Sequence, residues 1–330
     1  MELLRGFVDI QINGYDGVDF SADDLTVEGV QRATEKLVKS GTWAYAPTII
    51  TSDINLICHN AEIIVKALSE KPYATHFLGL HIEGPFISPE DGYRGAHRLE
   101  YVIPPSIDIF RKIQKAASGK VVMMTYAPET QGALEFAKQM QKESAKLSIG
   151  HTNADEKSFR EAVNAGACLS THLGNGIKNQ LPRHPNNIQS ILIEDRVMSG
   201  IITDGHHLGE TFIRLCLKAK GVKNLYVTCD CAHLVGYPPG RYTTLGQDVI
   251  ISETGRLSSA TGDFLVGSAS NTFMCMNYLA GLVKELTYEE LLQLGIFNSL
   301  KGIGAKMPEG QGLVNHKLFF DETTRKFSLI

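Results

Sequence analysis

The chain contains the stretch Leu80-His81-Ile82-Glu83-Gly84-Pro85-Phe86, in which a carboxylate stands at the end of an apolar run. Residues 76–82 read as a buried strand. Gly84-Pro85 ends it, because proline has no N–H for a strand ladder. Glu83 is therefore expected where the strand opens into a loop. A carboxylate there is costly to desolvate unless it is paired or bound to a metal.

Two later stretches have the same form as the first. Residues 147–151 and 168–172 are each a short apolar strand that ends in a histidine, His151 and His172. Three strand ends thus supply Glu83, His151 and His172. One carboxylate and two imidazoles form the ligand set of a catalytic zinc-type site with an open position.

Strands and helices alternate along the chain. Expected strands are residues 6–13, 45–50, 76–83, 121–126, 146–151, 167–172, 198–203 and 225–229. Expected helices between most of them are residues 26–39, 53–68, 106–117, 132–143, 156–165 and 210–220. Helical connections imply parallel pairing, and eight such units in roughly 250 residues predict a (β/α)8 barrel. The alternative is an open doubly wound sheet, but no Gly-x-Gly-x-x-Gly follows the first strand.

In such a barrel, the residues at the carboxyl ends of the strands converge on one face. Polar residues hold these positions: Gln11, Asn13, Glu83, His151, His172, Asp204, His207 and Asp230. Asp230 is the best candidate for the general base, and His207 for a contact to the oxyanion or the substrate. Gln11, Asn13 and His206 are candidates for lining the pocket. The pattern predicts metal-assisted hydrolysis of an amide or related bond.

Composition limits the other classes of function. The chain is 43% hydrophobic and 21% charged, with a net charge of -4, so nothing indicates binding to nucleic acid or to an anionic membrane. No apolar run approaches the ~20 residues that span a bilayer, and residues 1–5 are too short for a signal peptide. The six cysteines are scattered and read as buried free thiols. We therefore expect a cytoplasmic protein.

The last part of the chain differs in pattern. Residues 248–257 predict a hairpin with glycine in its turn, residues 271–285 and 288–300 predict helices, and residues 317–321 and 326–330 predict two strands. We assign residues 6–305 to the barrel and residues 306–330 to the C-terminal strands of a reduced β-sandwich.

The motifs resemble those of a known family. Its pattern is present in Gly79-Leu80-His81-Ile82-Glu83-Gly84-Pro85-Phe86, Gly95-Ala96-His97, Gly150-His151-Thr152-Asn153-Ala154, Thr171-His172-Leu173, Asp204-Gly205-His206-His207 and Cys229-Asp230. In this order they resemble the N-acetylglucosamine-6-phosphate deacetylases of the amidohydrolase superfamily. The resemblance implies a barrel enzyme that releases acetate from an N-acetylated amino-sugar phosphate.

The resemblance also implies roles for single residues. Glu83, His151 and His172 match the metal ligands, Asp230 the catalytic aspartate and His207 a substrate contact. His97, Asn175 and Gly176 match contacts to the sugar or its phosphate. Arg183 falls where the family has a phosphate-binding arginine that can reach the neighbouring subunit, so a homodimer is implied.

Three departures from the family pattern matter. Many amidohydrolases carry His-x-His where this chain has Gln11-Ile12-Asn13, and neutral amides are poor zinc ligands, so we expect one divalent metal, zinc or iron(II). His184-Pro185-Asn186 follows Arg183 where the family has Glu-Pro-Gly, which weakens the phosphate assignment. The family also has more residues before the barrel, forming part of a β-sandwich. This difference is why we expect that domain to be reduced.

Two alternatives to the first function stay open. The chain could deacetylate a related sugar, N-acetylgalactosamine 6-phosphate or an unphosphorylated amino sugar, or it could be a catalytically silent sugar-phosphate binding protein. Most of the remaining histidines are interpreted as solvent-facing or structural: His59, His76, His184, His233 and His316.

Overall fold

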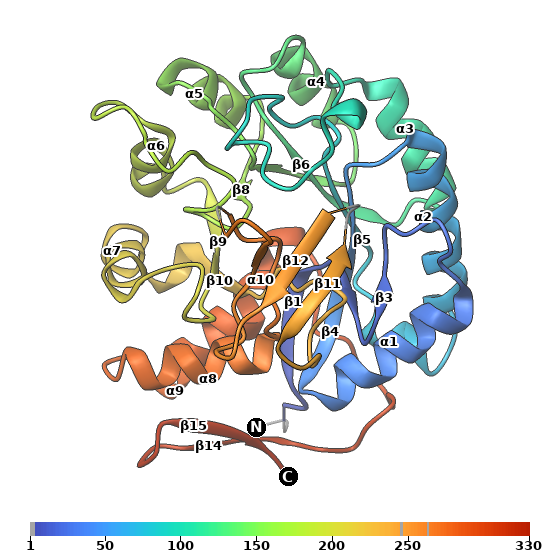
Figure 1. The fold of residues 1–330 in the computed structure, drawn as a ribbon, viewed down its shortest axis with the longest axis vertical. Helices are drawn as coiled ribbons and strands as arrows, with labels where there is room; N and C mark the ends of the chain where they lie inside the picture. Colours follow the sequence, from blue (N-terminus) through green and yellow to red (C-terminus); the bar gives the residue numbers. More distant parts are fainter. Residues whose placement is uncertain (1–3, 245–246, 263) are drawn as a thin grey trace.

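The computed structural model describes residues 4–244, 247–262 and 264–330. Its centre is a ring of parallel strands that pair in chain order (Figure 1). They are β1 (Phe7–Ile12), β4 (Thr42–Ile50), β5 (Leu80–Glu83), β6 (Val121–Tyr126), β7 (Lys146–Ile149), β8 (Leu169–Ser170), β9 (Met198–Ile202) and β10 (Leu225–Thr228). A parallel bridge between Ile12 and Cys231 joins the two ends of this sheet. The predicted eight-stranded barrel is confirmed.

Helices surround the ring of strands (Figure 1). They are α1 (Val27–Lys39), α2 (Ile54–Leu68), α3 (Ile107–Ala116), α4 (Ala133–Met140), α5 (Glu156–Asn164), α6 (Asn187–Ile193), α7 (Glu210–Lys220) and α8 (Thr272–Leu282). Side chains cap the first turns of α1 and α2: Thr26 accepts from the Gly29 N–H, and Asp53 from the N–H groups of Asn55 and Leu56. Of these helices, α6 was not predicted, because a helix of 7 residues is too short to show a clear helical repeat of apolar residues.

Polar side chains form a layer inside the barrel, just below the strand ends. His81 of β5 lies with Nδ1 3.2 Å from Thr48 Oγ1 and Nε2 2.8 Å from Thr125 Oγ1. Thr125 Oγ1 lies in turn 2.8 Å from Thr171 Oγ1. Burial lowers the pKa of His81 to about 4, so the ring is neutral near pH 7. These bonds tie β4, β5, β6 and the loop after β8 together directly beneath Glu83.

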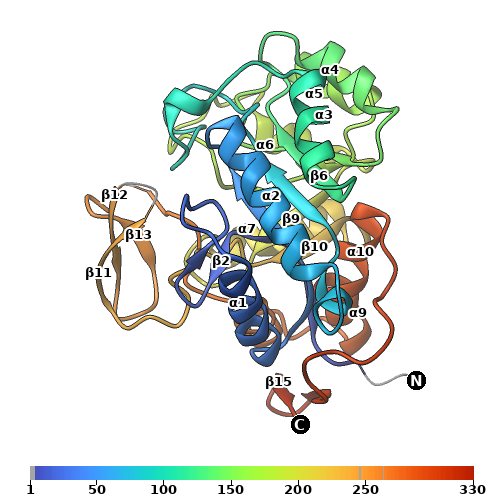
Figure 2. The ribbon, with the colours of Figure 1, turned by 90° about the vertical axis from the view of Figure 1, so that its right-hand side faces the viewer.

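A small antiparallel sheet follows β10 and stands over one end of the barrel (Figure 2). It consists of β11 (Gly240–Thr244), β12 (Gln247–Ile251) and β13 (Leu257–Ser259), and we call it the cap sheet. The predicted hairpin of residues 248–257 is present as β12 and β13, whereas β11 was not predicted. The cap sheet has its own small core: Ala232, Leu234, Val249, Ile251, Leu257 and Val266.

The end of the chain packs against Leu4 and the start of β1. After α8 come α9 (Tyr288–Leu292), a π-helical turn η4 (Gln293–Phe297), α10 (Asn298–Ile303) and the antiparallel ribbon of β14 (Leu318–Asp321) and β15 (Lys326–Leu329). Leu318 N–H donates to Leu4 O at 2.7 Å, and the Phe327 ring packs edge-on against Phe7. The two predicted strands are present, and the domain boundary at residue 305 stays a prediction.

The remaining elements are short. They are β2 (Gly14–Tyr15), β3 (Val18–Asp19) and the 3-10 turns η1 (Tyr73–His76), η2 (Leu99–Tyr101) and η3 (Val222–Asn224). Among the helices of the described residues, none has the length and apolarity needed to cross a bilayer.

Candidate metal centre and active site

Three of the predicted site residues have an unusual backbone conformation. His151, His172 and Asp230 have φ angles of 50°, 30° and 49°, in the left-handed region. Each follows the end of a barrel strand by two residues. For a residue other than glycine this conformation costs roughly 1–2 kcal/mol, so it persists only where the surroundings enforce it. The backbone strain thus coincides with the residues that the sequence assigns to the chemistry.

The three predicted ligands meet at one point. His172 Nε2 lies 3.0 Å from both Glu83 Oε1 and His151 Nε2, and His151 Nε2 lies 3.4 Å from Glu83 Oε1. All three side chains are buried. Although burial opposes it, the adjacent His151 and His172 rings hold the pKa of Glu83 well below its usual range. A negative charge therefore faces two imidazole nitrogens.

The hydrogen bond of His151 fixes its tautomer. Its Nδ1 lies 2.9 Å from Tyr93 O, and a carbonyl oxygen only accepts, so Nδ1 carries the proton and Nε2 presents a lone pair. Gly176 stands against the back of this ring, since a Cβ built there would lie 2.8 Å from His151 Nδ1. With φ of +60°, Gly176 also has a conformation that favours glycine.

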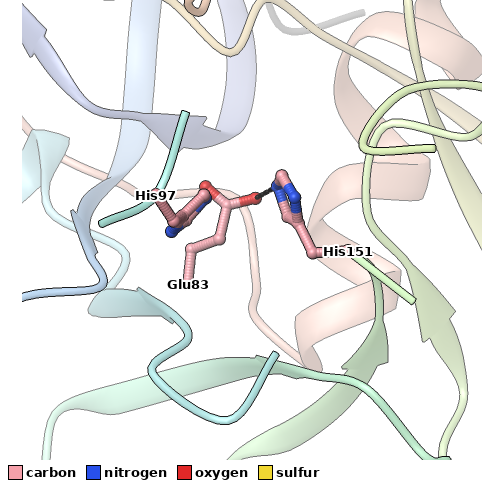
Figure 3. Close-up of side chains that lie close together, drawn as sticks. All are labelled: Glu83, His97 and His151. Atoms are coloured by element: carbon pink, nitrogen blue, oxygen red, sulfur yellow. Dashed lines mark ion pairs between the residues drawn. The ribbon is translucent and has the colours of Figure 1, made fainter. Parts of the chain in front are cut away.

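His97 belongs to the same centre. Figure 3 shows Glu83, His97 and His151 pointing toward one another, and each offers a ligand atom within 4.8 Å of the others. The His97 ring packs edge-on against His151, with centroids 4.3 Å apart, and its Nδ1 lies 2.8 Å from Thr51 Oγ1. Burial and the neighbouring His151 lower the pKa of His97 to about 3, so the ring is neutral.

The separations of Glu83, His151 and His172 suit a metal ion. Ligand atoms held about 2.0–2.1 Å from one tetrahedral zinc lie about 3.3 Å from each other. The observed distances of 3.0, 3.0 and 3.4 Å bracket this value. The donor set of one carboxylate oxygen and two imidazole nitrogens is the borderline set that zinc or iron(II) binds. The residues present therefore fit a divalent metal.

Gln11 and Asn13 act as donors to the carboxylates. Gln11 Nε2 lies 2.9 Å from Glu83 Oε1 and 3.0 Å from Asp230 Oδ1, and Asn13 Nδ2 lies 2.7 Å from Asp230 Oδ1. The two amides thus orient Glu83 and Asp230 from the end of β1. The amide oxygens, Gln11 Oε1 and Asn13 Oδ1, are buried and have no hydrogen-bond partner among the described residues.

Asp230 lies beside the ligands without belonging to the tight cluster. Burial raises the pKa of its carboxyl to about 6, and the charge of Glu83 adds to this, while His172 and the Asn13 bond act in the opposite direction. A carboxyl with a pKa near 6 exchanges a proton readily around neutral pH, as a general acid or base must.

A second pair of residues lies across the cavity. His207 Nδ1 lies 2.8 Å from Asp204 Oδ2, which also accepts from Ser268 Oγ at 3.0 Å. Although burial opposes it, the hydrogen bonds from His207 lower the pKa of Asp204 well below its usual range. Because the carboxylate accepts from Nδ1, Nε2 is the ring atom that can contact a ligand.

These groups surround a cavity of about 470 Å³. Most of the predicted residues line it: Asn13, Glu83, His97, His151, His172, Asn175, Gly176, His207 and Asp230. Gln11 lies buried behind this wall. Gln11, predicted as a pocket residue, is thus absent from the lining, and so are two further predicted residues, Arg183 and His206. Arg183 is exposed on the loop before α6, and His206 bonds through Nε2 to Thr254 O at 2.9 Å instead.

Sequence reasoning missed four ionisable residues of the cavity. They are Asp19, Lys178, His233 and Arg256. The interpretation of His233 as solvent-facing or structural, without a convergent partner, was wrong, because it lines the cavity 3.7 Å from the Asp19 carboxylate. Asp19 ends the two-residue strand β3, His233 lies in a loop, and Arg256 lies in the turn between β12 and β13. No strand-end pattern could have identified them.

The sequence of the chain is similar to those of known enzymes, all of one family. Residues 3–270 match the amidohydrolase family. The N-acetylglucosamine-6-phosphate deacetylase of Bacillus subtilis (strain 168) is 30% identical over 308 residues, which cover 92% of this chain and 75% of the relative. The deacetylase of the same name from Haemophilus influenzae is 33% identical over 277 residues, which cover 82% and 69%.

Solved structures agree with the sequence comparison. The N-acetylglucosamine-6-phosphate deacetylase of Pasteurella multocida superposes with a TM-score of 0.83 at 27% identity, over 98% of this chain and 83% of that one. A variant of the Mycobacterium smegmatis enzyme, solved in complex with N-acetyl-D-glucosamine-6-phosphate, has a TM-score of 0.85 over 99% and 85%. At 22% identity, that second likeness shows the fold alone.

Proposed function

Because this chain belongs to the amidohydrolase family, and within it to the N-acetylglucosamine-6-phosphate deacetylases, we propose that it hydrolyses N-acetylglucosamine 6-phosphate to glucosamine 6-phosphate and acetate. The observation that carries this proposal is the convergence of Glu83 Oε1, His151 Nε2 and His172 Nε2 within 3.4 Å, beside the Asp230 carboxylate. The relatives favour this reaction over the two alternatives, a related sugar and a silent binding protein.

We propose that Glu83, His151 and His172 hold one divalent metal ion, zinc or iron(II). Such an ion polarises a carbonyl and makes water acidic near neutral pH. The side-chain amide of Gln11 donates to both carboxylates of the site, and that of Asn13 donates to Asp230. Glu83 faces the histidines, and Asp230 keeps an oxygen directed toward the cavity.

Asp230 carries the proton in this proposal. Its carboxylate takes a proton from the attacking water and returns it to the nitrogen of the leaving amine. A pKa of about 6 suits both steps, because the carboxyl binds and releases the proton at little cost near pH 7. His207 Nε2, held in place by the bond from Nδ1 to Asp204, contacts the acetamide oxygen or a sugar hydroxyl.

His97, Asn175 and Gly176 line the same cavity and contact the sugar or its phosphate in this proposal. The backbone N–H of Asn175 is already engaged with His172 O at 2.9 Å. Its side chain is therefore the part available for the substrate, although its Nδ2 also lies 3.3 Å from His172 O.

We also propose a cytoplasmic homodimer. The six cysteines are all free thiols, which supports a reducing compartment. Arg183 is exposed and lies outside the cavity of its own chain, so it can bind phosphate only in the site of a second copy. A dimeric mass in solution, together with a Michaelis constant that rises in Arg183→Gln, would support this part of the proposal. A fully active monomer contradicts it.

The function is tested by acetate release from N-acetylglucosamine 6-phosphate and from unphosphorylated N-acetylglucosamine. The purified protein is assayed after chelation, with and without added zinc. Metal-dependent release from the phosphorylated sugar is the expected result. Absence of release from this substrate by protein that has bound one equivalent of metal would refute the proposal.

A further inference from the structure

We propose that Arg256 of the cap sheet binds the phosphate group of the substrate within the same subunit and so sets the preference for phosphorylated sugars. This inference rests on the proposed function. Arg256 and Lys178 are the lysine and arginine side chains that line the cavity among the described residues. Arg183, the arginine that the sequence suggested for phosphate, is not part of that lining. A cation for the phosphate of a substrate in this cavity must therefore come from one of these two residues or from another copy of the chain.

The charged groups of Lys178 and Arg256 differ in how many contacts they already make with the protein. Lys178 Nζ lies 3.0 Å from Glu90 Oε2 and 5.1 Å from the centre of the Tyr93 ring, so an ion pair and a cation–π contact engage it. Among the described residues, the guanidinium of Arg256 has one weak hydrogen bond, from Nη2 to Gly262 O at 3.4 Å. Arg256 is thus the better candidate to pair with a dianion.

The chain holds Arg256 in place through a tight turn between β12 and β13. Ser252 N–H donates to Arg256 O at 2.9 Å, and Arg256 N–H donates to Ser252 Oγ at 3.0 Å. Gly255 closes the turn with φ of +84°, a conformation that favours glycine. The position of the arginine is therefore built by the local sequence.

His206 fastens this turn to the barrel. Its Nε2 lies 2.9 Å from Thr254 O, and because a carbonyl only accepts, Nε2 donates. His206 N–H itself donates to Asp204 Oδ1 at 2.8 Å, the carboxylate that orients His207. The Asp204 carboxylate thus positions both His207, which lines the cavity, and His206, which holds the turn that carries Arg256. His206 is a positioning residue in this proposal.

A guanidinium group such as that of Arg256 is well suited to bind the phosphate of the substrate. A phosphate monoester carries close to two negative charges and offers three acceptor oxygens. A guanidinium presents paired N–H donors that match such oxygens. Three apolar residues, Phe264, Leu265 and Val266, line the same cavity.

The test compares kcat/KM for N-acetylglucosamine 6-phosphate and for N-acetylglucosamine in Arg256→Gln, with Lys178→Gln as the matched control. We expect the ratio of the two values to fall by about tenfold to a hundredfold in Arg256→Gln, through the Michaelis constant, and less in Lys178→Gln. Arg256→Lys should restore part of the ratio. An equal or larger fall in Lys178→Gln, or an unchanged ratio in Arg256→Gln, would overturn the assignment.

A binding measurement separates this inference from the proposed reaction. Calorimetry with glucosamine 6-phosphate and glucosamine as ligands of the intact chain requires no turnover. Arg256→Gln is expected to lose the preference for the phosphorylated product while its melting temperature stays unchanged. If neither acetylated sugar is hydrolysed but this preference depends on Arg256, the reaction is refuted and the binding role stands. If the preference depends on Arg183 alone, phosphate is bound from the second copy and the inference fails.

Discussion

The floor of the cavity and the cap sheet above it enclose one space but are built differently. The floor consists of strand ends set on the barrel core, and its polar side chains hold each other through Gln11, Asn13 and the His81 layer. The cap sheet rests on a separate core of six residues and reaches the barrel through contacts such as that from His206 to Thr254. The floor therefore determines the chemistry, and the cap sheet can change the substrate preference without disturbing it.

Removal of the metal should have the largest effect, because it acts on the floor alone. Chelation is expected to reduce acetate release to background, and zinc should restore it. The melting temperature should fall as well, since an ion that binds only the folded state stabilises it. Far-ultraviolet circular dichroism should stay the same, because the apolar clusters that pack the helices and strands do not include the metal ligands. Full activity in the chelated protein, with metal absent by mass spectrometry, would contradict the assigned ligands.

Asp230→Asn should follow in size. Asparagine keeps the shape of the side chain and loses the proton acceptor, so kcat is expected to fall by about 10²–10⁴-fold. Metal content should stay at that of the wild type, because Asp230 lies outside the ligand cluster. The control is Glu83→Gln, which should lose metal and activity together. An active Asp230→Asn variant excludes Asp230 as the base.

Asp204→Asn should have an intermediate effect, because it changes the orientation of His207 and not a reacting group. In the native protein His207 carries its proton on Nδ1 and donates it to Asp204. The asparagine side chain can instead donate an N–H to Nδ1, which favours the other tautomer of His207. A loss of about 10- to 100-fold in kcat/KM is expected. Ser268→Ala, which removes one bond to the same carboxylate, serves as the milder control. If both variants match the wild type, His207 acts without this support.

The smallest effects should distinguish the two regions by stability. Val227 of β10 and Val249 of β12 are both fully buried, so Val227→Ala and Val249→Ala remove the same atoms. We expect Val227→Ala to lower the free energy of unfolding of the barrel by about 1–2 kcal/mol. Val249→Ala should mainly speed hydrogen exchange in β11 to β13. Equal losses in denaturant unfolding would show that the cap sheet and the barrel unfold as one unit.

Sequence patterns predicted the floor far better than the cap sheet. The barrel strands are nearly continuous apolar runs, so each strand end could be located and its polar residue read directly. This is how Glu83, His151, His172 and Asp230 were found. Asp19, His233 and Arg256 come from short irregular segments or from an antiparallel sheet, where no period indicates which side chains face the cavity. Arg183 was taken from a family pattern, and the fold places it outside the cavity of its own chain.

The left-handed backbone of His151, His172 and Asp230 limits which amino acids these positions can accept. Asparagine, aspartate, histidine and glycine enter this region at low cost, whereas valine, isoleucine and other branched residues do so with difficulty. Random mutation at these three codons should therefore yield folded but inactive proteins mainly with asparagine, glycine, aspartate or histidine in place of the native residue. Mutational tolerance at the strand ends is set by φ as much as by chemistry, and a survey of folded variants would show both constraints.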